Sequence, residues 1–291
     1  MMRNRRVATL LILLLLALAP LAAESMRVHF IDVGQGEAVL LETGEAAILV
    51  DAGNGSTVAE YLVQEGIRRI DLAVATHAHA DHVGGFPAVF DRLPVKRVWY
   101  NGQVHTTRTF ERFLDAILGS DAIYEEPGRG DQLAVGSMTV TVLHPPGSAA
   151  DYRGHLHDMN IVVRIEQGAF SVLVTGDAET FAERSILEWV RSGALPPESL
   201  RSSVLQLGHH GSYTSSGAPF LSAVSPRIVV YQAGRDNRYG HPHGAVIRRV
   251  RETTGADILG TDKHGTIVIT AEGNRLVIRT ALPADPGGQS R

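Results

Sequence analysis

The sequence predicts a layered α/β fold, and three features of the chain support this prediction. Short apolar runs rich in Val, Ile and Leu alternate with stretches of helical periodicity, as in domains built from stacked strands and helices. The 291 residues are 44% hydrophobic and 20% charged, which is enough apolar material for a sizeable core. Because no long linker interrupts the alternation, we expect one domain over residues 26–280 and a disordered tail over residues 281–291.

The first 25 residues have the pattern of a secretory signal. Arg3, Arg5 and Arg6 precede an uncharged apolar run from Val7 to Ala23, and small residues follow that run. The run is short for a membrane span, so we expect a signal peptide at residues 1–25; the alternative is an uncleaved N-terminal anchor, the chain's one expected membrane contact. Either reading places the remaining chain outside the cytoplasm, in the periplasm or secreted.

The elements begin with a predicted meander of three strands, at Arg27–Val33, Ala38–Glu42 and Ala46–Val50, with glycine-containing turns between them. A helix at Thr57–Gln64 then leads into the apolar strand Asp71–Thr76.

Two amphipathic helices follow, at Thr106–Leu118 and Thr180–Val190. Their apolar residues, which include Phe110, Phe113 and Phe181, recur at helical spacing and are expected in the core. The remaining predicted elements are five strands, one helix and a final hairpin: Val135–Leu143, Ile161–Ile165, Phe170–Val174, Val204–Leu207, Arg227–Tyr231, Ala245–Thr253, and Thr266–Thr270 with Arg275–Thr280.

Composition narrows the possible chemistry. The chain has 27 basic and 31 acidic residues and a formal net charge of −4, so its overall charge gives no strong indication of nucleic-acid binding. Cysteine is absent, which excludes disulfides, thiolate nucleophiles and thiolate metal ligands. Histidine is abundant, with 13 residues, so any metal would be held by nitrogen and oxygen ligands.

The most informative motif is a cluster of three histidines and one aspartate directly after the strand Asp71–Thr76. If strand geometry continues, His77 and His79 project to the same side and can bind one metal ion. Asp81 and His82 lie beyond the strand end and can reach a second ion. Two divalent ions about 3.5–4 Å apart would hold a bridging hydroxide that acts as nucleophile.

One cluster cannot fill two coordination shells, so further ligands are expected at later strand ends. Asp177 follows the strand Phe170–Val174 and could bridge two ions. His209 and His210 follow the strand Val204–Leu207, and adjacent residues of an extended chain point to opposite sides. One of these two histidines is therefore the expected ligand, and the sequence leaves open which.

A third candidate ligand lies in the segment before the strand Ile161–Ile165. We favour His157, with His155 and Asp158 as alternatives, and an exposed polar loop without a ligand is a further alternative.

Other polar residues are candidates for supporting roles. His241 and His243 flank a proline in a loop and could contact substrate or protonate a leaving oxygen; a helix beginning at Pro242 is the alternative. Asp32 and Asp51 follow strands and either orient ligand histidines or close turns.

Several motifs together resemble the metallo-β-lactamase superfamily and, within it, the extracytoplasmic domain of ComEC-type competence proteins. The resemblance covers about Met26 to Thr270. It rests on Ile31-Asp32-Val33-Gly34-Gln35-Gly36, Val50-Asp51-Ala52-Gly53, the His77–His82 cluster, Thr175-Gly176-Asp177, Gly208-His209-His210-Gly211-Ser212 and Asn237-Arg238-Tyr239-Gly240-His241-Pro242. Glu37 and Asn160 depart from the family pattern, which usually has Asp and Ser at these positions.

The resemblance implies a four-layer αββα sandwich with a dinuclear site for zinc, or alternatively manganese, on one edge. It implies that His77, His79 and His157 hold one ion, that Asp81, His82 and either His209 or His210 hold the other, and that Asp177 lies between them. On this basis Asp81 and His241 are expected to take part in catalysis, and Asp32, Asp51, Ser212 and His243 to support the ligands or contact substrate.

Three functions are compatible with these residues. The first is a secreted or periplasmic phosphodiesterase acting on nucleic acid, a phosphorylated envelope polymer or a small-molecule substrate, because two metal ions suit displacement at phosphorus. The second is a β-lactam or lactone hydrolase, against which the absence of cysteine argues, since the family's lactamases commonly use a cysteine ligand. The third is a metal-stabilised accessory module that binds DNA or envelope polymer without catalysis.

Overall fold

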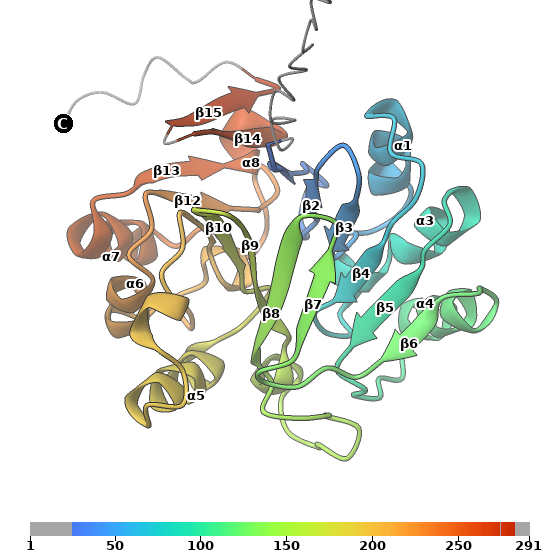
Figure 1. Ribbon diagram of the computed structural model, residues 1–291, viewed down its shortest axis with the longest axis horizontal. Helices are drawn as coiled ribbons and strands as arrows, with labels where there is room; N and C mark the ends of the chain where they lie inside the picture. The colour runs from blue at the N-terminus through green and yellow to red at the C-terminus, as the bar shows by residue number, and fades with distance from the viewer. Residues whose placement is uncertain (1–24, 274, 283–291) are drawn as a thin grey trace, which may run out of the picture.

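Two β-sheets face each other in the computed structural model, which describes residues 25–273 and 275–282, and helices cover both outer faces (Figure 1). The first sheet has eight strands in the order β15-β14-β1-β2-β3-β4-β5-β6. Their bounds are β1 Arg27–Phe30, β2 Val39–Glu42, β3 Ala47–Val50, β4 Leu72–Ala75, β5 Arg97–Tyr100, β6 Ile123–Glu125, β14 Ile267–Glu272 and β15 Arg275–Thr280.

The second sheet has seven strands in the order β13-β12-β11-β10-β9-β8-β7. Their bounds are β7 Gln132–Val135, β8 Met138–His144, β9 Val162–Gln167, β10 Phe170–Val174, β11 Val204–Gln206, β12 Ile228–Tyr231 and β13 Asp257–Gly260.

Three helices pack on the outer face of each sheet, which gives the αββα sandwich that the resemblance implied (Figure 1). The first sheet is covered by α1 Thr57–Gln64, α3 Phe86–Arg92 and α4 Arg108–Leu118, and the second by α5 Thr180–Arg191, α6 Ala218–Val224 and α7 Gly244–Thr254. The shorter helical segments are α2 Ala80–Val83, α8 Thr261–His264 and the 3₁₀ turns η1 Leu156–Met159, η2 Pro197–Ser199 and η3 His209–Gly211.

The core lies in three layers, one between the sheets and one under each set of helices. Strand β3 shows how the sequence produces this arrangement, because it is apolar at every position. Ile48 and Val50 face the inter-sheet core, whereas Ala47 and Leu49 pack with helix residues such as Leu62. A strand buried on both faces has a continuous apolar run rather than an alternating one.

The topology places several chain segments at one edge of the sandwich. In the first sheet β3, β4 and β5 are parallel, and in the second β10, β11 and β12 are parallel. The carboxyl ends of parallel strands lie on the same side of a sheet, and the loops that leave these ends are where binding residues of open α/β sheets are commonly found.

Some expected elements differ from those observed. The expected strand Val135–Leu143 is instead a hairpin of β7 and β8, because Gly136 adopts a left-handed φ of 59° and reverses the chain. Phe181, expected in the core, is 52% exposed on α5, since the buried face of that helix is formed by residues such as Ala182 and Ile186.

The ends of the chain lie mostly outside the described residues. The expected signal segment falls there except for its last residue, as does the expected tail from residue 283 onward. Within the tail range, Ala281 and Leu282 are described, and their amides donate hydrogen bonds to the carbonyls of Thr266 and His264. In the described ranges 25–273 and 275–282, every helix is too short or too polar to cross a membrane.

Candidate metal centre

Histidines and aspartates from both sheets converge at the edge where the parallel strands end. His77 follows β4, Asp177 follows β10 and His210 follows β11, while His157 lies on η1 directly before β9. All four side chains are buried in the structure. Segments far apart in the sequence therefore bring their polar side chains into one site.

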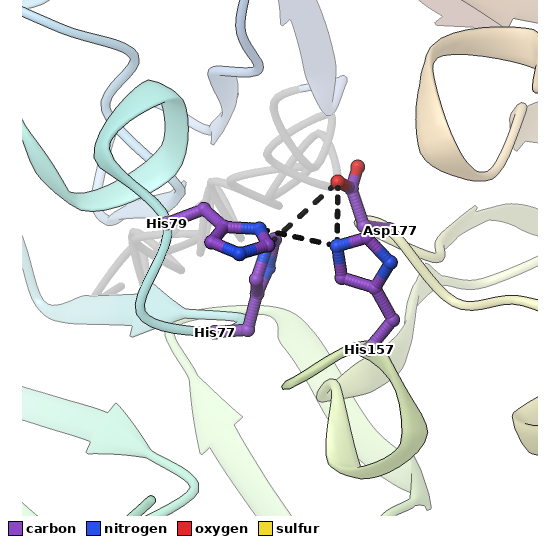
Figure 2. A group of neighbouring side chains, drawn as sticks. All are labelled: His77, His79, His157 and Asp177. Atoms are coloured by element: carbon purple, nitrogen blue, oxygen red, sulfur yellow. Dashed lines mark hydrogen bonds and ion pairs between the residues drawn. The ribbon is translucent and has the colours of Figure 1, made fainter. Parts of the chain in front are cut away.

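The first group of ligand atoms comprises three imidazoles and one carboxylate (Figure 2). His79 Nδ1 lies 2.9 Å from His77 Nε2 and 3.1 Å from His157 Nε2. Asp177 Oδ2 lies 3.7 Å from His77 Nε2 and 3.4 Å from His157 Nε2. Two ligands of one tetrahedral zinc ion are about 3.4 Å apart, so these spacings fit a shared ion.

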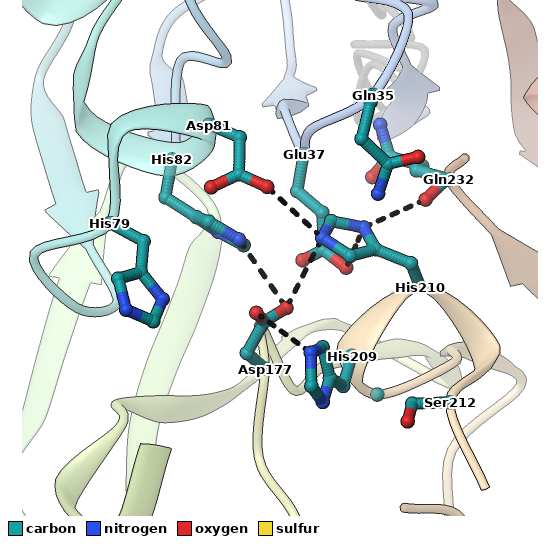
Figure 3. Close-up of polar contacts among 12 residues, drawn as sticks. Gln35, Glu37, His79, Asp81, His82, Asp177, His209, His210, Ser212 and Gln232 are labelled. Carbon is teal, nitrogen blue, oxygen red and sulfur yellow. Dashed lines mark hydrogen bonds and ion pairs between the residues drawn. The ribbon is translucent and has the colours of Figure 1, made fainter. Parts of the chain in front are cut away.

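The second group comprises Asp81, His82 and His210 (Figure 3). His210 Nε2 lies 3.4 Å from Asp81 Oδ2 and 3.6 Å from Asp177 Oδ1. His82 Nε2 lies 3.3 Å from the same Asp177 oxygen. A carboxylate and two imidazoles are ligand types that suit zinc or manganese, and Asp177 adds a further oxygen.

Asp177 stands between the two groups and divides its oxygens between them. Oδ2 is near the ligand atoms of the first group, and Oδ1 is near those of the second. Burial alone would raise the pKa of the Asp177 carboxyl, but the adjacent imidazoles of His82 and His210 hold it well below its ordinary range. The carboxylate is therefore ionised, as a bridging metal ligand must be.

Three buried atoms at the second group, two of its own and one of Asp177, test whether a cation fits. His82 Nε2, His210 Nε2 and Asp177 Oδ1 have no hydrogen-bond partner among the described residues. Buried polar atoms in native proteins are normally satisfied, and exceptions call for an explanation such as an ion. Because electron-pair donors converge here, the residues present fit a bound cation.

The partners of the opposite ring nitrogens determine which nitrogen is free to act as ligand. His82 Nδ1 donates to Asp51 Oδ2 at 2.7 Å, and His210 Nδ1 donates to the Gln232 carbonyl at 2.9 Å. With the proton on Nδ1, each ring turns the lone pair of Nε2 toward the second group.

The first group is oriented in the same way. Thr76 Oγ1 donates to Asp51 Oδ2, so it can accept from His77 Nδ1 at 3.1 Å. Glu179 Oε1 lies 3.2 Å from His157 Nδ1, which places the proton of that ring on Nδ1 as well. The lone pairs of the Nε2 atoms of His77 and His157 therefore face the cluster.

His77 and His79 reach the cluster by a different route from the one expected. Strand β4 ends at Ala75, so the two histidines do not alternate along a strand, and His79 instead occupies the N-cap position of the short helix α2. After α2 the chain passes close to the loop that follows β3: the Gly85 amide bonds the Gly53 carbonyl, and a Cβ at Gly85 would lie 2.0 Å from the Ala52 oxygen.

The geometry expected for His209 and His210 was also wrong. Both have positive φ, 48° and 54°, within the turn η3, so they are not extended and do not point to opposite sides. Both rings face Asp177 (Figure 3), but only His210 belongs to a group of convergent ligand atoms. His209 Nδ1 bonds Glu179 Oε1 at 3.0 Å, and its side chain is 21% exposed at the site.

Burial and contacts distinguish the three candidate ligands in the segment that precedes β9, which are His157, His155 and Asp158. His157 is buried in the first group, whereas His155 is exposed and its Nδ1 accepts from the His157 amide. Asp158 is turned away and accepts a hydrogen bond from the Tyr152 hydroxyl at 2.7 Å.

The two aspartates after the early strands have different environments. Asp51 bonds a ring of the second group, as one of its two expected roles required. Asp32 does not contact a histidine of the site; its Oδ1 accepts from the Gly34 amide at 3.0 Å and closes a turn. Asp32 therefore closes a turn, which was the other role expected for it.

The loop after β12 brings further rings to the site. His241 lies 5.8 Å from the His210 ring and 5.5 Å from the His209 ring. His243 accepts from the Tyr213 amide and lies 5.0 Å from His241. The alternative of a helix beginning at Pro242 was wrong, because α7 begins at Gly244 after a cis His241-Pro242 peptide.

The contacts that Glu179, Thr214 and Glu37 make at the site were missed by sequence reasoning. Glu179 bonds both His157 and His209, and the Ser212 hydroxyl lies 3.0 Å from Thr214 Oγ1, which in turn donates to Glu179. Glu37 is buried, and its Oε1 lies 3.5 Å from His210 Nδ1. The signal for Glu179 was its position two residues after Asp177, close to a strand end.

A pocket of about 360 Å³ opens onto both groups of ligand atoms. It is lined largely by polar and aromatic side chains: Gln35, His79, Ala80, Asp81, His105, Thr107, His157, Asp177, His209, His210, Tyr239 and His241.

An αββα sandwich with this His and Asp cluster on one edge defines a class of metal-binding proteins, and comparison with known families gives its name. Residues 31–235 match the model of the metallo-β-lactamase superfamily, and the chain belongs to this superfamily.

Sequence comparison places competence proteins among its relatives. The chain is 27% identical over 279 residues to ComE operon protein 3 of Bacillus subtilis, which covers 88% of this chain and 34% of that protein. It is 34% identical over 242 residues to competence protein ComA of Neisseria gonorrhoeae, covering 81% of this chain and 31% of that protein. The chain therefore spans about a third of the length of these relatives.

Solved structures agree on the fold. The metallo-β-lactamase fold protein YhfI from Bacillus subtilis has a TM-score of 0.53 at 14% identity, covering 88% of this chain and 100% of that chain.

Proposed function

We propose that the protein is a dinuclear metal-dependent hydrolase that cleaves phosphodiester bonds outside the cytoplasm. The observation that carries the proposal is the division of the two Asp177 oxygens between two groups of ligand atoms. Membership of the metallo-β-lactamase superfamily supports a hydrolase, and the similarity to competence proteins favours a phosphodiester of nucleic acid. A phosphorylated envelope polymer would offer the same bond.

The ligand set assigns residues to two ions. His77, His79 and His157 would hold one, Asp81, His82 and His210 the other, and Asp177 would contact both. Nitrogen and carboxylate ligands suit zinc, with manganese as the alternative. A pair of divalent ions supplies a nucleophile at neutral pH and neutralises charge that develops on the phosphate.

The surrounding side chains would position the substrate. His209 and His241 line the pocket beside the second group, where the His241 ring N–H could donate to a phosphate oxygen or to the leaving oxygen. Glu179 holds Nδ1 of His209, which fixes the tautomer and leaves Nε2 available at the site. Asp81 is both a ligand and, at 35% side-chain exposure, the carboxylate of the second group open to an entering substrate.

The test combines metal content with turnover. We expect about two metal ions per chain by elemental analysis, together with hydrolysis of bis-p-nitrophenyl phosphate and single-stranded DNA. His79→Ala and Asp177→Asn should lose metal and activity, because each removes a ligand atom, while Asp151→Asn on the exposed surface should behave as the unmodified protein.

Other outcomes would contradict the proposal. Turnover of nitrocefin without turnover of either phosphodiester would identify a lactam hydrolase. Two bound metal ions with no turnover of any of these three substrates would argue for a binding module.

A further inference from the structure

A second pocket, of about 610 Å³, adjoins the metal centre. His79 and His105 line both this pocket and the pocket at the metal centre, so the two spaces meet at these rings. A substrate with its reacting group at the metal centre would therefore extend into the second pocket. Its other walls come from residues 103–104, after β5, and 152–156, before and within η1.

The charge of the second pocket favours an anionic ligand. None of the side chains that line it, as the described residues define it, is a carboxylate. Arg153 is exposed, and its Nη1 donates to the backbone carbonyls of Ala150 and Tyr152. Because carbonyl groups carry no net charge, these contacts do not neutralise the positive charge of the guanidinium. His155 is exposed and accepts at Nδ1 from the His157 amide, so its proton is on Nε2. A guanidinium and an imidazole N–H are suitable donors to a phosphate group.

Gln103, on the inner wall of the pocket, has a buried oxygen without a hydrogen-bond partner among the described residues. Gln103 is only 3% exposed, and its Oε1 is buried with no hydrogen-bond partner among the described residues. The Gln103 backbone is held by two contacts, since its amide bonds Asn101 Oδ1 and its carbonyl accepts from the Tyr100 hydroxyl. A buried acceptor without a hydrogen bond costs free energy. Because Oε1 itself is buried, a turn of the side-chain amide toward the pocket is needed before a ligand N–H or O–H group can reach it, and such a ligand would be favoured.

The pocket also carries aromatic surface. The rings of His105 and Tyr152 line it, and the exposed side chain of Val104 adds apolar area. Aromatic side chains next to cationic ones are the combination that proteins use to bind single-stranded nucleic acid, with the rings against bases and the cations near phosphates.

We infer that the second pocket binds the nucleotide that flanks the scissile phosphodiester of a single-stranded nucleic acid. Arg153 and His155 contact its phosphate, the rings of Tyr152 and His105 pack against its base, and the Gln103 amide turns toward the pocket to accept a hydrogen bond from a base N–H. This inference rests on the proposed function, because it takes the metal centre as the place where the phosphodiester is cleaved.

The first test compares a substrate that fills the second pocket with one that does not reach it. We would measure KM for hexathymidylate and for bis-p-nitrophenyl phosphate. Arg153→Gln should raise KM for hexathymidylate by about tenfold, the effect of losing one charge-assisted hydrogen bond, so the ratio between the two KM values changes. Arg153→Lys should recover part of the loss, and Arg191→Gln, at an exposed position on α5, serves as the matched control.

The second test measures binding without turnover. Fluorescence anisotropy of labelled hexathymidylate with phosphorothioate linkages should show the same tenfold loss of affinity for Arg153→Gln and a weaker salt dependence, because one phosphate contact is removed. Gln103→Leu should weaken this binding while thermal melting remains unchanged or improves, since the substitution removes an unsatisfied buried acceptor.

Specific results would overturn the inference. These are equal effects of Arg153→Gln on both substrates, no effect on either, or competition by a glycerol phosphate oligomer equal to that of hexathymidylate. If the unmodified protein hydrolyses neither substrate, the proposed function fails, whereas the anisotropy measurement still decides whether the pocket binds a strand.

Discussion

Asp51 and Asp32 each follow a strand of the first sheet, and their surroundings give them different roles at the scale of single residues. Asp51 accepts from His82 Nδ1 and from both the amide and the hydroxyl of Thr76, so it orients one ring of each group of ligand atoms. Asp32 bonds only local backbone through its carboxylate. Substitution of a residue that orients metal-binding rings in this way commonly changes metal affinity or activity.

Asp51→Asn should therefore lower metal affinity or activity by about 10–100-fold. The residue has a φ of 55°, which asparagine tolerates well, so the backbone should persist while the amide nitrogen faces donors that the carboxylate had satisfied. Metal titration and far-UV circular dichroism check this, with Asp32→Asn as the matched control. Equal losses in the two variants would contradict the distinction between these aspartates.

His210→Ala and His209→Ala should have separable effects. His210 Nε2 belongs to the second group, so its removal should lower metal content by about one ion per chain. His209 is held by Glu179 beside the site, so its removal should leave metal content near two and lower kcat by at least tenfold. Elemental analysis and steady-state kinetics distinguish the two, and loss of an ion in His209→Ala instead would reverse the assignment.

At the scale of elements, the site depends on how strands end. The strands β4, β10 and β11 end two, three and four residues before His77, Asp177 and His210, and short turns then set the direction of each side chain. The glycine pair between α2 and α3 makes one such turn possible. Gly85 lies against the Ala52 backbone, next to Asp51, and the Ala52 amide bonds the His82 carbonyl.

Gly85→Ala should lower the free energy of unfolding by about 2 kcal/mol or more, because its Cβ would overlap a backbone oxygen that cannot rotate away. For a chain of this size this corresponds to a fall in Tm of about 4–8 °C. The matched control is Gly147→Ala, where no atom lies within 4 Å of the added Cβ. Thermal melts with equal Tm for both variants would exclude this close approach.

At the scale of the whole molecule, the ligands of each group come from both sheets. In the first group, His77 and His79 follow a strand of the first sheet and Asp177 follows a strand of the second. In the second group, His82 comes after a strand of the first sheet and His210 after a strand of the second. Bound metal would therefore tie the two halves of the sandwich together. A ligand that binds only the folded state raises stability by mass action.

Chelation should accordingly lower Tm. At free metal of 100 times Kd, binding contributes about 2.7 kcal/mol, which corresponds to about 5–10 °C for a chain of this size. Differential scanning calorimetry with EDTA, and then with zinc or manganese restored, measures the shift. The His79→Ala variant should show a smaller shift in Tm on chelation. An unchanged Tm in the unmodified protein would show that metal does not join the sheets.

The sequence by itself determined the fold class, most elements and the residue types of the candidate site, because periodicity and strand-end polar motifs are local properties. The helix expected at Thr57–Gln64 has the same bounds in the structure, and the polar side chains of the His77–His82 cluster lie at the candidate metal centre. Locally encoded features of this kind are visible in the order of residues.

Only the tertiary structure decided which ring turns toward which group. Whether His209 or His210 converges with Asp81 depends on left-handed backbone angles in η3, and the role of Asp51 depends on a ring 31 residues away. Likewise, the pocket that joins His105 to His155 forms only when loops from the two sheets meet. Such contacts depend on packing between distant segments, which residue spacing along the chain does not encode.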